Sequence, residues 1–174
     1  MSTYYQHYDR AIRNDDLLKN LRKLNRLGRI FFNKSIKRFP DWYISIAFHS
    51  ATQHFEAMLA EVKPKILLPE QGTPSTGRKI LVAVEHTADT YPYYGINFHI
   101  NAHGGSEHRS RLRMIEQSSV FDGLRDAYCL LNNYNRTGKY NNYVPNKRTW
   151  ILAERWLTIL RDECRSLIFR SKSK

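Results

Sequence analysis

Residues 42–62 carry the feature that most limits what this chain can fold into, because their apolar side chains recur at intervals of three and four residues. Such spacing places the side chains on one face of an α-helix that begins after Pro40. His54 lies on the flank of this face, where a histidine is more often a satisfied core or interface residue than a ligand. The pattern predicts a core helix whose apolar face consists of Ile44, Ala47, Phe48, Ala51, Phe55, Met58, Leu59 and Val62.

A second amphipathic helix is predicted over residues 15–38, within a basic N-terminal arm that spans residues 1–38. Its apolar stripe consists of Leu17, Leu21, Leu24 and Phe31. We expect the arm to pack onto its own domain. Attachment to a membrane surface, which basic amphipathic helices also support, is the alternative.

The C-terminal half continues the helical pattern. Leu112 and Ile115 point inward from a helix that follows Ser106, and the next helix carries Phe121, Leu124, Tyr128 and Leu131. The last helix follows Asn146, and its apolar face consists of Ala153, Trp156, Leu157, Leu160, Cys164, Leu167 and Ile168. This series predicts a mainly α-helical, up-and-down bundle.

Prolines and glycines interrupt the helices over residues 63–105. Within this stretch, residues 79–86 and 94–101 alternate apolar and polar side chains, which is typical of strands. We expect the two strands to form a small β-hairpin insertion. With 174 residues, the chain is long enough for one domain, residues 1–174, and short for two.

The net charge of +12 indicates attraction to phosphates or to an acidic partner. The charge is concentrated at the two ends: residues 1–38 hold ten basic and three acidic side chains, and residues 145–174 hold eight and three. The two cysteines, Cys129 and Cys164, have no metal-site spacing and are expected to be reduced thiols. No signal peptide or membrane span is apparent, so we expect a cytoplasmic protein.

Three histidines, His99, His103 and His108, stand close together in the sequence. Their spacing matches no standard zinc site, and a polar strand face followed by a helix start is favoured over metal binding. The glycines at 104–105 belong to neither a P-loop nor a dinucleotide fingerprint. We therefore expect no metal and no cofactor.

The segment 132–143, NNYNRTGKYNNY, is rich in asparagine and tyrosine and contains no acid. Its helical spacing from Tyr128 brings Arg136 near the bundle face, where a guanidinium needs an anion or several carbonyl groups. The alternative is a helix C-terminal cap assisted by Gly138. Spacing alone favours the cap.

Three segments, in this order, resemble the HEPN helical proteins of bacteria and archaea. DWYISIAFHSATQHFEAMLAE is similar to their first core helix, SEHRSRL to the start of their second, and DAYCLLNNYNRTGKY to their arginine-containing helix end. The resemblance covers about a third of the chain. It implies a bundle that dimerises and, in active members, a metal-independent endoribonuclease whose arginine and histidine meet across the dimer.

The family's motif is an arginine followed after a short spacing by a histidine. Arg136 matches the arginine, but Asn141 stands at the histidine position, and Tyr143 follows where some toxin members have a tyrosine. Because asparagine cannot take up and return a proton near neutral pH, the acid and base would have to be His108 or, as the alternative, His54.

Two functions are compatible with these features. One is an RNA-cleaving homodimer of toxin or defence type, in which Arg136 contacts the scissile phosphate and His108 transfers the proton. Its substrate contacts would come from Arg109, Lys139, Tyr140, Asn141 and Tyr143. The other is a non-catalytic HEPN-like dimer that binds nucleic acid, a cognate antitoxin or another partner protein through its basic terminal helices.

Overall fold

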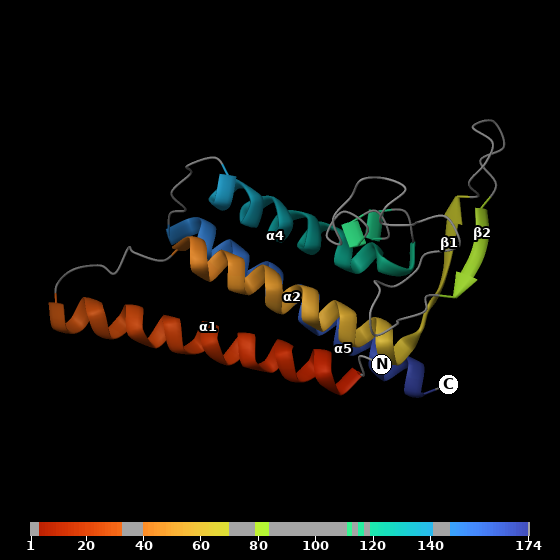
Figure 1. The fold of residues 1–174 in the computed structure, drawn as a ribbon, viewed down its shortest axis with the longest axis horizontal. Coiled ribbons are helices and arrows are strands. Elements are labelled where there is room, and N and C mark those ends of the chain that lie inside the picture. The colour runs from red at the N-terminus through yellow and green to blue at the C-terminus, as the bar shows by residue number, and fades with distance from the viewer. Residues whose placement is uncertain are drawn as a thin grey trace.

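The computed structural model describes residues 4–32, 40–69, 79–83, 111–112, 115–116, 119–140 and 147–173. Its long helices are α1 (Tyr4–Phe32), α2 (Pro40–Val62), α4 (Asp122–Tyr140) and α5 (Lys147–Lys172), and a 3-10 helix, η2 (Ser119–Phe121), leads into α4. Successive long helices run in opposite directions along one bundle (Figure 1). The predicted mainly α-helical bundle is confirmed.

Helix α2 is the centre of this bundle and packs against α1, α4 and α5. Seven of the eight residues predicted for its apolar face are at most 1% exposed, and Val62 is partly buried. The ring of Phe55 lies 5.3 Å from that of Phe121 and 6.0 Å from that of Tyr128. These aromatic contacts join η2 and α4 to the central helix.

The predicted apolar faces of the two C-terminal helices are also confirmed. Phe121, Leu124, Tyr128 and Leu131 are fully buried. In α5 the core residues are Ala153, Leu157, Leu160 and Cys164, with Trp156, Leu167 and Ile168 partly buried against them. Both cysteines are free thiols, as expected, and burial raises the pKa of Cys164 far above its ordinary value.

Helix α1 begins well before residue 15, and its buried face differs from the predicted leucine stripe. Leu17 and Leu24 are 45% and 58% exposed, whereas Ala11 and Leu18 are 0% and 4% exposed. The prediction was wrong for Leu17 and Leu24, whereas Leu21 packs against the core and the side chain of Phe31 is not described. The inward face also carries the polar Asp15, which apolar spacing does not reveal. The expected packing of the arm onto its own domain is confirmed by its contacts with α2.

Two short strands follow α2. β1 (Lys65–Pro69) and β2 (Lys79–Ala83) pair antiparallel, with Leu67 opposite Leu81. Residues 79–86 were predicted to form a strand, and β2 lies within them. The partner of β2 in the described sheet is β1, a segment for which no strand was predicted. The expected partner, residues 94–101, lies outside the described residues. In the part of the chain that the structure describes, no helix is both long and apolar enough to span a membrane.

Candidate nucleic-acid interface

Arg136 is exposed on α4 rather than turned toward the bundle. Asn132 and Asn135 take the inward positions and are 5% and 8% exposed. The helix continues through Gly138 to Tyr140, so the glycine does not end it as a cap. Within the described ranges, Arg136 forms no ion pair or hydrogen bond, which leaves its guanidinium accessible to an external anion.

The remaining predicted site residues are not brought together in the described structure. Lys139 and Tyr140 belong to the last turn of α4, and their side chains are not described. Outside the described residues lie His99, His103, His108, Arg109, Asn141 and Tyr143. Contact between Arg136 and His108 therefore stays a prediction. No group of three metal-binding side chains occurs among the residues that the structure does describe.

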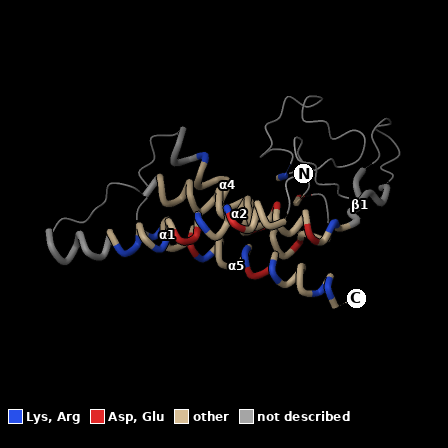
Figure 2. Tube along the Cα trace, turned by 60° about the horizontal axis from the view of Figure 1, so that its bottom comes forward, with Lys and Arg blue, Asp and Glu red and all other residues tan. Residues whose placement is uncertain are grey.

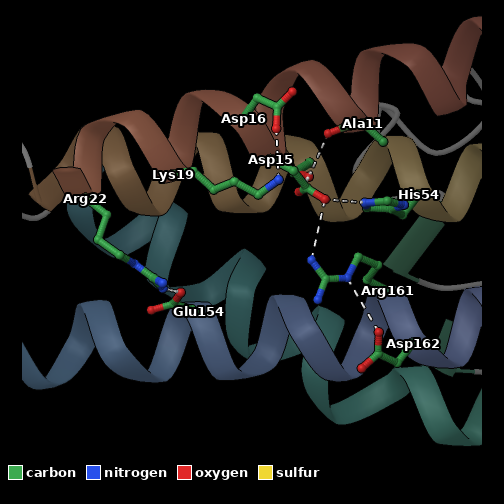
Figure 3. A network of polar contacts seen from close by, with 10 residues as sticks. Ala11, Asp15, Asp16, Lys19, Arg22, His54, Glu154, Arg161 and Asp162 are labelled. Carbon is green, nitrogen blue, oxygen red and sulfur yellow. Dashed lines mark hydrogen bonds and ion pairs between the residues drawn. The ribbon is translucent and has the colours of Figure 1, made fainter.

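A buried carboxylate, Asp15 of α1, connects three helices (Figure 3). Its Oδ1 accepts a hydrogen bond of 2.5 Å from Ser50 Oγ, and its Oδ2 lies 3.1 Å from His54 Nε2 and 3.6 Å from Arg161 Nη1. Burial acts to raise the pKa of Asp15, but hydrogen bonds from His54 and Ser50 and the charge of Arg161 outweigh it and hold the pKa below its ordinary value. His54 is thus a satisfied core residue, as predicted.

The contact of a serine, an aspartate and a histidine does not form a hydrolase triad here. In such a triad the histidine lies between the other two, whereas Ser50 and His54 both contact the carboxylate of Asp15. The three residues are 0%, 3% and 6% exposed, in the order Ser50, His54 and Asp15, so a substrate has no access to them. We conclude that this cluster holds α1, α2 and α5 together.

A second buried polar contact joins α2 to the segment before η2. Arg111 and Glu56 are each 1% exposed, and Arg111 Nε donates a hydrogen bond to Glu56 Oε1. Tyr128 of α4 is close enough for their charges to act on it. Burial raises the pKa of Tyr128 to about 12, and the charge of Arg111 opposes this shift. This pair is a core contact that the sequence analysis missed.

Several basic side chains on the surface are already neutralised by acids. Arg13 pairs with Asp9 at 2.6 Å, and Lys19 pairs with Asp16 at 2.9 Å. Arg22 pairs with Glu154 of α5, and Lys172 pairs with Glu61 of α2 at 2.9 Å. The strength of the basic surface therefore depends on which cations lack such partners.

The outward side of α5 carries four exposed arginines that have no acidic partner among the described residues: Arg148, Arg155, Arg165 and Arg170. We call them the α5 arginine face. Basic positions recur along this helix as far as its C-terminal end (Figure 2). Two apolar side chains of α5, Ile151 and Phe169, are 54% and 74% exposed. Together these groups offer positive charge and apolar surface to an extended anionic partner.

Comparison with known protein families, with curated proteins and with solved structures found no match to this chain. The HEPN resemblance therefore stays a prediction from the sequence segments. Function has to be inferred from the charge and geometry of the described helices.

Proposed function

We propose that this protein is a HEPN-like bundle that binds single-stranded nucleic acid, with RNA as the expected partner. The observation that carries this proposal is the α5 arginine face, whose four guanidiniums are exposed and have no acidic partner among the described residues. Guanidinium groups bind phosphate in bidentate geometry. The exposed ring of Phe169 suits stacking with an unpaired base, and the exposed Ile151 adds apolar contact surface.

The dimensions of this face suit a strand several nucleotides long. Arg148 and Arg170 are separated by about 33 Å along the helix axis at 1.5 Å per residue. The net charge of +12 adds a long-range attraction that raises the rate of encounter with a polyanion. The HEPN resemblance, which implies a dimer acting on RNA, supports the choice of RNA and of two copies.

Neutralising the α5 arginine face should reduce the salt dependence of RNA binding. The control of salt dependence is tested with the variant that combines R148Q, R155Q, R165Q and R170Q. The negative slope of log K against log salt should become less steep by about 3, because each lost phosphate contact removes about 0.7 from its magnitude for single strands. Fluorescence anisotropy with a labelled single-stranded RNA over a series of salt concentrations measures this slope. Circular dichroism checks that the exposed substitutions leave the fold intact.

The matched control removes the same charge from cations that already have acidic partners. It combines K19Q, R22Q and K172Q with R125Q, since Arg125 of α4 also has an acidic partner, Asp122 at 2.5 Å. We expect this variant to retain most of the wild-type slope. Equal losses in both variants would show that binding follows net charge alone, and binding that does not respond to salt would indicate a protein partner instead.

RNA cleavage is the second candidate function. It is favoured by Arg136, which is exposed and has no partner among the described residues. A guanidinium in that position can stabilise the charge that develops on a scissile phosphate. Incubation of a labelled RNA in EDTA with wild type, Arg136→Ala and His108→Ala, followed by a denaturing gel, tests it. Cleavage by wild type alone is the expected result for a nuclease, and intact RNA in every lane would restrict the function to binding.

A further inference from the structure

A groove between α1 and α2 lies apart from the α5 arginine face. Its lining consists of Arg10, Arg13, Asn14, Ile46, His49 and Gln53. Asp15, the residue after Asn14, turns toward Arg161 of α5. Because successive residues of a helix point in different directions, the groove and the contacts with α5 lie on different flanks of α1.

The α1 wall of this groove is basic. Arg10 is exposed and has no ion pair or hydrogen bond with any residue that the structure describes. Arg13 pairs with Asp9, but their side chains are 77% and 57% exposed, and such surface pairs are weak enough to exchange for a stronger anion. No carboxylate is among the lining residues that the structure describes. The groove therefore presents two guanidiniums, and among the described residues few carboxylates compete with an anionic ligand for them.

The α2 wall adds donors and a small apolar surface. Gln53 Oε1 lies 2.8 Å from Nδ1 of the buried His7. Because an amide oxygen only accepts hydrogen bonds, His7 donates, and the two N–H groups of Gln53 keep their donor function. His49 stands one turn before Gln53, and Ile46 supplies the apolar surface. A ligand here would meet donors beside a hydrophobic contact.

We propose that this groove binds a phosphate monoester, either of a free nucleotide or of the phosphorylated end of a nucleic acid. A monoester carries nearly two negative charges at neutral pH, which matches two guanidiniums, whereas each internal phosphodiester carries one. The amide donors of Gln53 and Asn14 suit the remaining phosphate oxygens, and Ile46 suits the attached nucleoside. This site goes beyond the proposed strand binding, because it uses neither α5 nor a continuous strand.

Isothermal titration of the full chain with adenosine monophosphate, and separately with adenosine, tests the site. We expect the monophosphate to bind and adenosine to bind at least about tenfold more weakly, since the charge-assisted contacts are lost. The R10Q/R13Q variant should lose at least about tenfold in affinity for the monophosphate. The control variant K19Q/K172Q, which removes the same charge from cations outside the groove and outside the α5 arginine face, should bind it as wild type does. Equal affinity of the two variants for the monophosphate would overturn the proposal. So would a wild-type affinity for adenosine that equals its affinity for the monophosphate.

A second arm identifies the source of the phosphate. The affinities of a 5′-phosphorylated and a 5′-hydroxyl RNA of one sequence are compared by anisotropy. Tighter binding of the phosphorylated strand, lost in R10Q/R13Q, supports recognition of a nucleic-acid end. Equal binding of both strands, together with R10Q/R13Q-sensitive monophosphate binding, supports a free nucleotide. The 5′-hydroxyl strand also tests strand binding by α5 separately, so failure of one proposal is distinguishable from failure of the other.

Discussion

Replacing Arg111 with methionine should lower the free energy of unfolding by about 3–5 kcal/mol, because it removes the cation that pairs with the buried carboxylate of Glu56. Arg111 and Glu56 are each 1% exposed, so water cannot replace the lost partner. Desolvation of a charge is costly unless a partner of opposite charge compensates it. This is the largest effect that we expect from a single substitution in the described core.

The converse substitution, Glu56→Gln, should also destabilise strongly, because it removes the anion that accepts the hydrogen bond of the buried Arg111 Nε. The double variant Glu56→Gln with Arg111→Met should recover much of the loss, since neither charge is then buried alone. Urea unfolding, monitored by circular dichroism, gives the free energy of unfolding of all three variants.

The control for this series is Lys19→Met, which breaks an exposed pair in which the side chains of Lys19 and Asp16 are 66% and 58% exposed. We expect little change in the unfolding midpoint, because such surface pairs contribute little. A midpoint for Arg111→Met that matches the Lys19→Met midpoint would contradict the buried pairing of Arg111 with Glu56.

The apolar core was predictable because helical spacing alone identifies it. Phe48 and Phe55 fall on one face of α2 whatever packs against that face, and both are fully buried. Glu56 was not predicted, since it lies off the apolar stripe and charged residues are ordinarily exposed. Its burial follows from the three helices around α2. The positions of these helices belong to the tertiary structure, so the spacing of residues within one helix does not predict the burial of Glu56.

The candidate interface was predictable only in outline. Charge counting indicated basic terminal helices, but which cations stay unpaired depends on contacts between helices such as Arg22 with Glu154. Helical spacing from Tyr128 predicted Arg136 near the bundle face, whereas the structure turns Asn135 inward and Arg136 outward. Successive residues of a helix are rotated by about 100° about its axis. The apolar stripe contains few residues near the end of α4, so it does not determine which of two neighbouring residues faces inward.

Replacing Asp15 with alanine should lower the free energy of unfolding by about 1–3 kcal/mol at neutral pH. The carboxylate is the acceptor for Ser50 and the partner of His54. Ser50 Oγ also lies 3.4 Å from the carbonyl oxygen of Ala11, so the loss falls mainly on the buried His54, and a buried group left without a partner costs about 1–3 kcal/mol. Arg161 should contribute less to the loss, because its side chain is 26% exposed and also pairs with Asp162 at 3.5 Å. Urea unfolding at pH 7 gives the value.

The contribution of Asp15 should also depend on pH. Its pKa in the folded protein is held below the ordinary value of 3.8. Stability from the ionised group is therefore fully present above that value and is lost as the pH falls through the folded-state pKa. Asp15→Asn keeps the size of the side chain but cannot ionise. The difference in unfolding free energy between wild type and Asp15→Asn should be constant near neutral pH and should shrink at acidic pH.

Measuring that difference from about pH 5 to pH 2 separates the effect of charge from that of shape. The control is Asp16→Asn at the neighbouring exposed position, for which we expect a small difference at every pH because solvent screens the Lys19 pair. A difference for Asp15→Asn that stays constant down to pH 2 would show that Asp15 stabilises the bundle through packing and neutral hydrogen bonds. The ionised carboxylate would then not be what holds α1 against α2 and α5.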